Sequence, residues 1–434
     1  MGLSSCRTRG GRSARQAIDN RAYADTLVLD YRLLEYFPRA GGCPLSDIDS
    51  ALKVLADAVA SPREYALAWK QRTGRKVVGA FPMNFPGEII HAAGALSVVV
   101  QDSRAPITDG RSLLPEFHCG YTRSVADQAA TGNFDYFDAF LCADHCIQLL
   151  GAVDTIRFVM PRTPVHFVQF ISSMNDAWGQ QQINETMQSF ADELEQLLGV
   201  QITQEALAES IGLFNRNRQL LRRLYDLRRT GVNITAAQMQ LMVQSSMVMD
   251  KREHNEILAP LVDLFADWTI NPPQPVRLHL SGHLCHAPRA ELLTAIEECG
   301  ATVVDDDLFT GYRYISTDVV TDGDLIEALG RWYVDRNDNV PCPTRVQHNV
   351  DWDGYLMQSI DKSQATGVIV LMVKFCEPHM LYYPELRKTL EEHGIPLLLI
   401  ETEHEGLPLE SIRTRVETFV EQIRRRQSSV PVPA

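Results

Sequence analysis

A strand–helix–glycine–strand pattern occurs three times in this 434-residue chain and limits what the chain can fold into. In each case a short apolar, β-prone run precedes a helix-like segment, a glycine and a second apolar run. Glycine in that place ends a helix because it adopts a left-handed backbone without steric cost. Such units favour parallel sheets with helices on their faces. The three units span residues 77–100, 276–304 and 367–401, with Gly94, Gly300 and Gly394 at the helix ends.

A long helical stretch separates the first unit from the other two. From about Ser172 to Trp268 apolar residues recur at helical spacing. Before the first unit, Ser46 is the expected cap of a helix through residues 48–59. We therefore predict an α/β fold with two Rossmann-like parallel-sheet domains, joined by a long helical section and preceded by an N-terminal helical extension. The expected ranges are 1–70 for the tail and N-terminal helices, 71–195 for the first α/β domain, 196–270 for the helical section, and 271–434 for the second α/β domain.

The charge of the chain argues against several classes of partner. The net charge is −14, and the basic face that a nucleic-acid binder needs is not visible. The arginine-rich first 21 residues are interpreted as a solvated polar tail. We find no apolar run long enough to span a membrane and no secretory signal, so we expect a cytoplasmic protein without membrane contact.

The nine cysteines suggest either buried free thiols or metal ligands. Their odd number, in a chain without an export signal, argues against a disulfide framework. Three of them, Cys119, Cys146 and Cys376, are expected near strand ends, where α/β proteins gather functional groups. Helix N-termini there would lower the pKa of each thiol and stabilise an anion.

Thiolates from three distant segments can hold a cubane iron–sulfur cluster with one iron left open. The spacing of these cysteines matches no local cluster motif, so scattered core cysteines remain the alternative on spacing alone. A zinc site that uses Cys142, His145 and Cys146 is a further alternative. The chain contains no P-loop, no G-x-G-x-x-G and no G-x-S-x-G motif.

Two polar segments follow predicted strands of the second half. The acidic run 305–307 is interpreted as a solvated loop or helix cap, with a cation site as the alternative. The segment 281–286, which contains Ser281 and Cys285, either lines a pocket or is an ordinary loop.

In this order, several segments between about Gly74 and Glu403 resemble the 2-hydroxyacyl-CoA dehydratase and benzoyl-CoA reductase subunit family, and are similar to the D-component of 2-hydroxyglutaryl-CoA dehydratase. The segments are GRKVVGAFPMNFPGEIIHAAGAL at 74–96, LLPEFHCGYTRS at 113–124, the region around Cys146, the helical stretch 202–228, SGHLCHAPRAELLTAIEECGATVVDDDLF at 281–309, and GVIVLMVKFCEPHMLYYPELRKTLEEHGIPLLLIETE at 367–403.

The resemblance implies a [4Fe–4S] cluster held by three cysteines of the chain. The matching residues are Cys119, Cys146 and Cys376. Relatives tend to have Asp directly after the second cysteine, whereas Ile147 follows here, so Cys142 is kept as a substitute for Cys146. The residues that we expect to line a pocket beside the cluster are His118, His145, Ser281, Cys285 and Glu377.

The resemblance also implies an activity and partners. These are an acyl-CoA substrate, a paralogous second subunit, and a separate iron–sulfur activator that hydrolyses ATP and delivers single electrons. A dehydratase of this family forms a ketyl radical from the thioester and expels the 2-hydroxyl group, whereas benzoyl-CoA reductase adds electrons to the aromatic ring. The sequence favours both almost equally.

Two other functions are compatible with the residues. One is a non-catalytic electron-transfer or scaffold subunit, which would be favoured by four protein ligands to the cluster and no cavity beside it. The other is a metal-free α/β protein that binds a small anion, which requires Cys119, Cys146 and Cys376 to lie far apart.

Overall fold

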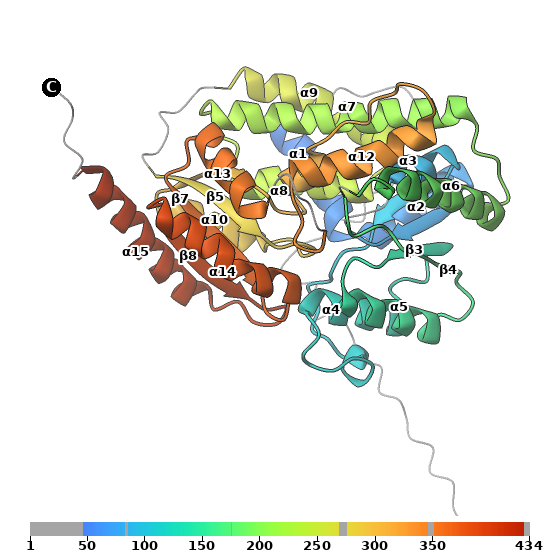
Figure 1. Ribbon diagram of the computed structural model, residues 1–434, viewed down its shortest axis with the longest axis horizontal. Coiled ribbons are helices and arrows are strands. Elements are labelled where there is room, and N and C mark those ends of the chain that lie inside the picture. Colours follow the sequence, from blue (N-terminus) through green and yellow to red (C-terminus); the bar gives the residue numbers. More distant parts are fainter. Residues whose placement is uncertain (1–46, 83–85, 175, 269–275, 346–350, 429–434) are drawn as a thin grey trace, which may run out of the picture. The chain divides into compact units, whose positions relative to one another are not determined.

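The computed structural model describes residues 47–82, 86–174, 176–268, 276–345 and 351–428 (Figure 1). The arginine-rich tail, with Cys6 and Cys43, lies outside the described residues, as does Ser46. The structural statements below concern the described residues.

Eight strands form two four-stranded sheets in which every neighbouring pair is parallel. The strand orders are β2-β1-β3-β4 and β6-β5-β7-β8, so the two sheets repeat one topology. The predicted α/β class with two parallel sheets is therefore confirmed. The first sheet contains β1 (Val77–Ala80), β2 (Leu96–Val99), β3 (Ala139–Ala143) and β4 (Val165–Val168), and the second contains β5 (Arg277–Gly282), β6 (Thr302–Asp306), β7 (Gly367–Val373) and β8 (Leu397–Thr402).

Each predicted strand–helix–glycine–strand unit is present. The helices are α3 (Gly87–Ala92), α10 (Ala290–Glu298) and α14 (Glu377–Glu392). Gly94, Gly300 and Gly394 follow them with φ angles of 76°, 85° and 67°, in the left-handed region where glycine avoids a Cβ clash.

The remaining helices include those predicted for the N-terminal extension and the middle of the chain. The first begins after Asp47, whose carboxylate accepts a hydrogen bond from Ser50 N at 2.7 Å, so the predicted cap at Ser46 is wrong. These helices are α1 (Ile48–Ala60), α2 (Pro62–Thr73), the 3₁₀ helix η3 (Asp109–Ser112), α4 (Gly120–Ala130), α5 (Ile147–Val159), α6 (Gly179–Leu198), α7 (Gln204–Arg229), α8 (Ala236–Val248), α9 (Lys251–Ala266), α11 (Tyr312–Ile315), α12 (Leu325–Asn339), α13 (Trp352–Ser363) and α15 (Leu409–Ser428).

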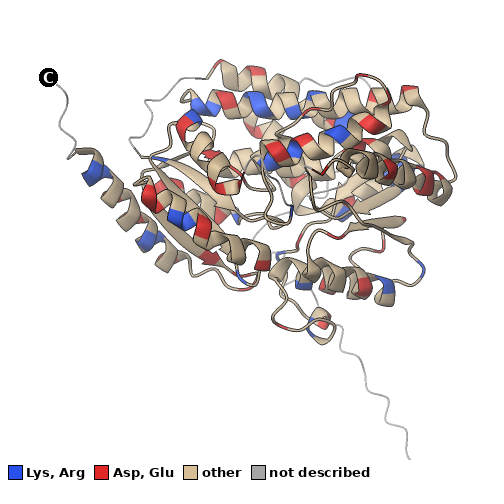
Figure 2. Ribbon diagram, in the orientation of Figure 1, with Lys and Arg blue, Asp and Glu red and all other residues tan. Residues whose placement is uncertain are grey.

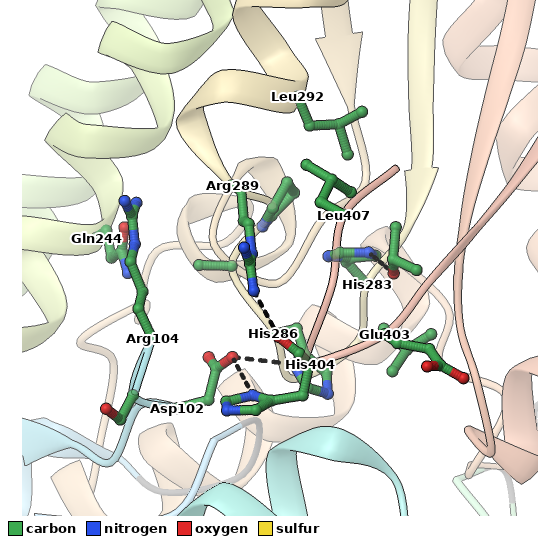
Figure 3. A pocket seen from close by; sticks show the side chains of 15 residues that line it. Asp102, Arg104, Gln244, His283, His286, Arg289, Leu292, Glu403, His404 and Leu407 are labelled. Carbon is green, nitrogen blue, oxygen red and sulfur yellow. Dashed lines mark hydrogen bonds and ion pairs between the residues drawn. The ribbon is translucent and has the colours of Figure 1, made fainter. Parts of the chain in front are cut away.

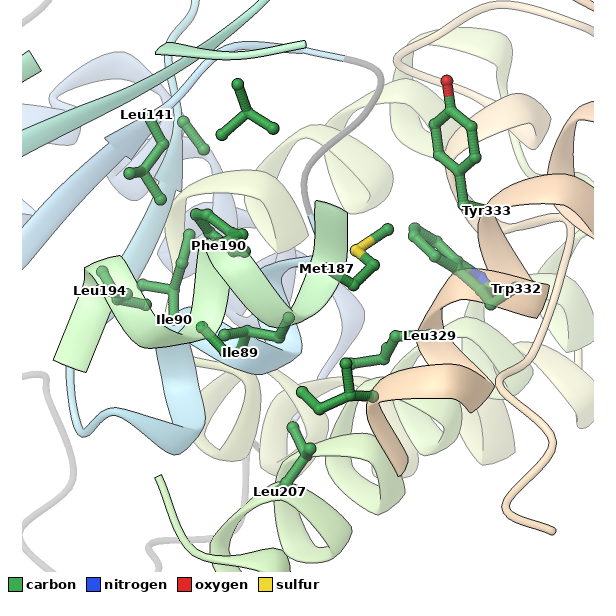
Figure 4. Close-up of a cluster of buried hydrophobic side chains, with 14 of the residues drawn as sticks. Ile89, Ile90, Leu141, Met187, Phe190, Leu194, Leu207, Leu329, Trp332 and Tyr333 are labelled. Atoms are coloured by element: carbon green, nitrogen blue, oxygen red, sulfur yellow. The ribbon is translucent and has the colours of Figure 1, made fainter. Parts of the chain in front are cut away.

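One face of the first sheet is covered by helices from both halves of the chain. Figure 4 shows Leu141 of β3 near Phe190 of α6, with Leu329 and Trp332 of α12 in the same cluster. These side chains are at most 6% exposed, and burying each removes apolar surface worth about 2 kcal/mol from water. The helix α12 follows β6 in the chain but packs in the cluster over the first sheet. The domain ranges 71–195 and 271–434 remain a prediction, and α12 crosses from the second range to the first sheet.

The second sheet has an apolar cluster on each face. One cluster joins β5, β6 and β7 to α10 and α15, through residues such as Leu293 and Phe419. The other joins β7 to α13 and α14, through Trp352, Leu356 and Leu386. The strand β7 is buried along its length, and this burial requires helices on both faces of the sheet.

The acidic run 305–307 is buried in this second half, so its interpretation as a solvated loop is wrong. The first carboxylate pairs with Arg229 Nη2 at 2.7 Å. The second accepts a hydrogen bond from the Tyr225 hydroxyl at 2.6 Å, and the third accepts from the Trp352 indole N–H at 2.7 Å. Each carboxylate has a protein partner, as burial of a charge demands.

Elsewhere, acidic and basic side chains are interspersed along the covering helices (Figure 2). In the part of the chain that the structure describes, we find no helix with the length and apolarity needed to cross a membrane.

A buried ion pair joins α3 to α7. Arg218 Nη1 lies 2.8 Å from Glu88 Oε1, and the two side chains are 7% and 0% exposed. The exposed pair Arg252–Glu209 offers a comparison, with side chains 56% and 61% exposed. Removing one partner of a buried pair leaves a charge without compensation, whereas solvent screens an exposed pair.

We predict that Arg218→Met lowers the free energy of unfolding by about 3 kcal/mol, because it strands the Glu88 carboxylate. Arg252→Met should cost less than about 1 kcal/mol. Urea denaturation of both variants measures the difference. Adding Glu88→Gln to Arg218→Met should recover part of the loss, and equal losses in the two single variants would contradict this account.

Candidate functional site: a buried thiol pocket

Four cysteines, Cys119, Cys146, Cys285 and Cys376, line one pocket with an empty volume of about 460 Å³. Three of them are the N-cap residues of helices: Cys119 of α4, Cys146 of α5 and Cys376 of α14. The positive ends of three helix dipoles are therefore at the pocket. The other residues that line it are Tyr121, Thr122, His145, Gln148, Leu149, Leu284, His286, Thr344, Val373, Glu377 and Pro378.

The strand order explains how residues this far apart meet. Cys146 follows β3, Cys285 follows β5, and Cys376 follows β7, so each is placed at the carboxyl end of a strand. β1 and β3 are neighbours in the first sheet, and β5 and β7 are neighbours in the second. After β1 the chain continues to β2 on one side of the sheet, and after β3 it continues to β4 on the other; β5 and β7 diverge in the same way. The point between two such strands is the topological switch point, where α/β sheets form binding crevices.

The side chain of Gln148 connects the segments that carry Cys119, Cys146 and Cys376. Its Oε1 accepts a hydrogen bond from the backbone N–H of Cys119 at 2.6 Å. Its Nε2 donates to the carbonyl of Phe375, directly before Cys376, at 2.8 Å. Gln148 itself lies two residues after Cys146, in the first turn of α5. One amide group thus fixes three chain segments relative to one another.

The backbone beside two of the cysteines is held in unusual conformations. Phe375 has a φ of 66°, which is strained for a residue with a side chain, and it places Cys376 at the start of α14. Gly120 follows Cys119 where a Cβ atom would lie 2.6 Å from His404 Cβ. Only glycine permits the start of α4 to approach the 404 loop this closely.

His286 links the thiol pocket to a neighbouring polar pocket. Its Nδ1 lies 3.1 Å from Asp102 Oδ2, and its Nε2 accepts from the backbone N–H of Tyr121 at 2.8 Å when the ring is neutral. Burial alone would lower the pKa of His286, but the Asp102 carboxylate raises it to about 9. When the ring is protonated, Nε2 carries a proton and is a donor for the Cys119 thiolate instead.

Figure 3 shows the polar pocket, in which Asp102 lies between His286 and His404. Arg289 Nη2 donates to the His404 carbonyl at 2.5 Å and so ties the loop after β5 to the loop after β8. This pocket shares His286 and Val373 with the thiol pocket.

Burial, and then the charges of neighbouring thiols, raise the pKa values of three of the four pocket thiols. Burial first, and then the charge of Cys119, raise the pKa of Cys146 to about 12. The same causes raise the pKa of Cys376, and the pKa of Cys285 rises through burial and the charges of Cys146 and Cys376. At Cys119 burial is outweighed by the hydrogen bonds of His286 and Thr122, and the pKa is lowered.

His145, one of the predicted pocket residues, is buried among basic side chains and lines the pocket. It is 3% exposed and its Nε2 lies 3.8 Å from Cys342 Sγ. Burial, and then the charges of Arg345 and Arg336, lower its pKa well below the ordinary value. It is therefore a neutral ring at physiological pH.

Not every predicted site residue reaches the pocket. Cys142 lies in β3, is fully buried, and is not among the residues that line the pocket, whereas Cys146 is. His118 stacks on Phe117 with ring centroids 5.1 Å apart, outside the pocket. The Ser281 hydroxyl donates to Asp307 Oδ2 at 2.8 Å and belongs to the carboxylate network. Glu377 does line the pocket, at the start of α14.

The donor set limits which metal groups fit. Among the described residues, no three His, Cys, Asp or Glu side chains form a group that could hold one metal ion, so the zinc site from Cys142, His145 and Cys146 is not formed. Four thiols that line one pocket suit a polynuclear cluster, whose ligands stand further apart than those of a single ion.

Sequence reasoning did not identify Gln148, Asp102 or His286 as members of the site. His286 lies in the segment 281–286 that was expected either to line a pocket or to form a loop. For Gln148, the only feature of the local sequence that points to the site is its position in the first turn of a helix that begins directly after a candidate ligand. Its partners lie 29 and 227 residues away, and such pairings leave no local pattern.

The fold and the pocket define an α/β protein in which four cysteines from distant segments line one pocket. A family model described as "2-hydroxyglutaryl-CoA dehydratase, D-component" matches residues 82–423. The chain therefore belongs to this family of enzyme subunits.

Several relatives align over most of the chain. The (R)-phenyllactyl-CoA dehydratase beta subunit of Clostridium sporogenes is 25% identical over 388 residues, which cover 87% of this chain and 100% of the relative. One of the benzoyl-CoA reductase subunits of Thauera aromatica is 25% identical, over 83% of this chain and 94% of its own length. The lactoyl-CoA dehydratase beta subunit of Anaerotignum propionicum is 26% identical, with 87% and 100% covered.

We predict that Gln148→Ala loosens the thiol pocket without unfolding the protein. Each lost hydrogen bond is worth about 1 kcal/mol, so iodoacetamide should label Cys119 and Cys376 roughly tenfold faster in metal-free protein. Mass spectrometry of the labelled peptides measures both rates. Cys142, buried in β3, is the internal control, and Gln188→Ala on the exposed face of α6 is the matched variant. Unchanged labelling would show that Gln148 does not fix these segments.

Proposed function

We propose that this chain is the [4Fe–4S]-bearing subunit of an enzyme that transforms acyl-CoA thioesters by single-electron chemistry. The observation that carries the proposal is the common pocket of three helix-capping thiols, Cys119, Cys146 and Cys376. These are the three cysteines that the family resemblance assigns to a cluster. The metal-free anion-binding alternative required them to lie far apart, which is not the arrangement found.

The residues around the pocket suit such a cluster. Cys119, Cys146 and Cys376 would hold it, and when bound it would store and pass single electrons. Backbone N–H groups near the thiols, those of Gln148 and Leu149 at Cys146, counter the rise in thiol pKa that burial causes. Among the described residues that line the pocket there is no lysine or arginine, so helix N-termini and His286 supply the positive potential.

The protein's own side chains would then position and shield the group. Gln148 fixes the ligand segments, and His286 places a hydrogen-bond donor beside Cys119 when its ring is protonated. Leu149, Leu284 and Val373 give the pocket an apolar wall that excludes water. A dry site strengthens every electrostatic interaction within it, and hydrogen bonds to thiolates tune the potential of a cluster.

The reaction is proposed to be of the 2-hydroxyacyl-CoA dehydratase or the benzoyl-CoA reductase type. The relatives at 25–26% identity carry names of both kinds. They are also named as subunits, which supports a paralogous partner chain here, and a separate ATP-hydrolysing activator remains part of the proposal. The cytoplasmic location likewise stays a prediction.

Iron and acid-labile sulfide, measured after anaerobic purification, test the proposal. We expect about four of each per chain in the wild type. A variant that combines Cys119→Ala, Cys146→Ala and Cys376→Ala should lose most of both, because it removes three ligands at once. Cys142→Ala and Cys299→Ala are matched controls at cysteines outside the pocket and should keep the full content.

A wild-type protein without iron, or full iron in the combined variant, would refute the proposed cluster. If the cluster is present, assays with acyl-CoA substrates and an activator would then separate the dehydratase from the reductase.

A further inference from the structure

We propose that Cys285 is a fourth thiolate ligand of the cluster, so that this chain supplies a ligand to every iron. The inference rests on the proposed cluster and departs from the three-cysteine set that the family resemblance implies. A cluster with four protein ligands has no open iron to bind a substrate oxygen. The chain would then be the electron-transfer subunit, and the acyl-CoA would bind elsewhere in the enzyme.

The placement of Cys285 in the fold is the first support. It lines the same pocket as Cys119, Cys146 and Cys376. It comes from the loop after β5, and Cys376 comes from the loop after β7, the neighbouring strand. Gly282, at the end of β5, lies opposite Leu371 of β7 in the parallel register. The two loops therefore leave the sheet side by side, toward the same pocket.

The backbone on the N-terminal side of Cys285 is held firmly in a strained conformation. Gly282 and His283 have φ angles of 111° and 44°, and the latter is uncommon for a residue with a side chain. A Cβ atom at Gly282 would lie 2.4 Å from the Leu371 carbonyl oxygen. His283 N donates to that same carbonyl at 3.2 Å, and its Nε2 lies 2.8 Å from Thr402 Oγ1. The loop cannot relax without breaking these contacts.

The other side of Cys285 is held by His286, whose Nδ1 lies 3.1 Å from Asp102 Oδ2. In contrast, the Cys285 thiol itself makes no hydrogen bond within the part of the chain that the structure describes. A thiol that is fixed on both sides, shares a pocket with three other thiols and has no hydrogen-bond partner among the described residues has the properties of a metal ligand.

A fifth cysteine serves as the comparison. Cys342 is 3% exposed and lies near the pocket, but it is not among the residues that line it. Its thiol lies 3.1 Å from Thr344 Oγ1 and 3.8 Å from His145 Nε2, so its polar contacts are already satisfied. Burial near the pocket therefore does not by itself make a thiol a candidate ligand.

Mössbauer spectroscopy of the ⁵⁷Fe-loaded, full-length protein tests the inference. As each Fe–S bond forms, the thiol gives up its proton to solvent, and four thiolates make the four iron environments alike. We expect the wild type to show no distinct iron. Cys285→Ala should keep about four irons per chain, with about one quarter of the iron in a distinct site. Cys342→Ala, the matched control, should resemble the wild type.

A second measurement tests how the cluster reacts with a mild oxidant and with cyanide, and EPR spectroscopy records the result. A cluster with an open iron loses it on mild oxidation, which leaves a three-iron cluster with its own EPR signal. Only Cys285→Ala should give this signal readily, and only its reduced EPR spectrum should change on addition of cyanide. Cys285→Ser keeps the size of the side chain and guards against a folding defect in the alanine variant.

The outcomes separate this inference from the proposed function. A wild-type cluster that already shows one distinct iron, or that binds cyanide as readily as the Cys285→Ala cluster, overturns the fourth ligand and leaves the cluster standing. Wild-type protein without iron overturns both, and the iron assay recognises that case before any spectrum is recorded.

Discussion

The amide side chain of Gln148 is the interaction on which the candidate site depends. Two hydrogen bonds, of 2.6 and 2.8 Å, hold the start of α4 and the residue before Cys376 against the first turn of α5. The two sheets bring three helix starts to one place, but only a contact of this kind sets their distances. A longer or shorter side chain could not reach both the Cys119 N–H and the Phe375 carbonyl. The geometry of the pocket is thus fixed by a residue that contributes no thiol.

The two halves of the molecule handle buried charge in different ways. In the second half, the carboxylates 305–307 are each matched by a neighbouring donor or cation, and Arg229 is the clearest example. In the thiol pocket the opposite holds, because four thiols share one pocket and no lysine or arginine is among the described residues that line it. The first arrangement stabilises a fold that is already complete. The second makes ionisation of most of the thiols costly, because burial and neighbouring thiols oppose the charge.

Much of the fold could be predicted from the sequence because local patterns determine it. The apolar runs and their glycine stops identified six strands, since a helix end at Gly94 or Gly394 needs only neighbouring residues. The edge strand β4 (Val165–Val168) was missed because its half-exposed residues give little apolar contrast. In the site, the cysteines were visible as residue types at strand ends. Gln148 and the Ser281–Asp307 hydrogen bond were not, because their geometry depends on side chains brought together by tertiary structure.

The position of α12 has a consequence for how the chain matures. Its side chains Leu329, Trp332 and Tyr333 complete the apolar cluster over the first sheet, yet they follow β6 in the sequence. During synthesis the strands and early helices of the first sheet therefore emerge from the ribosome well before this part of their cover exists. Until then an apolar surface stays open to solvent and to chaperones, which bind such surfaces. The first sheet cannot reach its final packing as an N-terminal fragment, and the last step of its assembly waits for the second half of the chain.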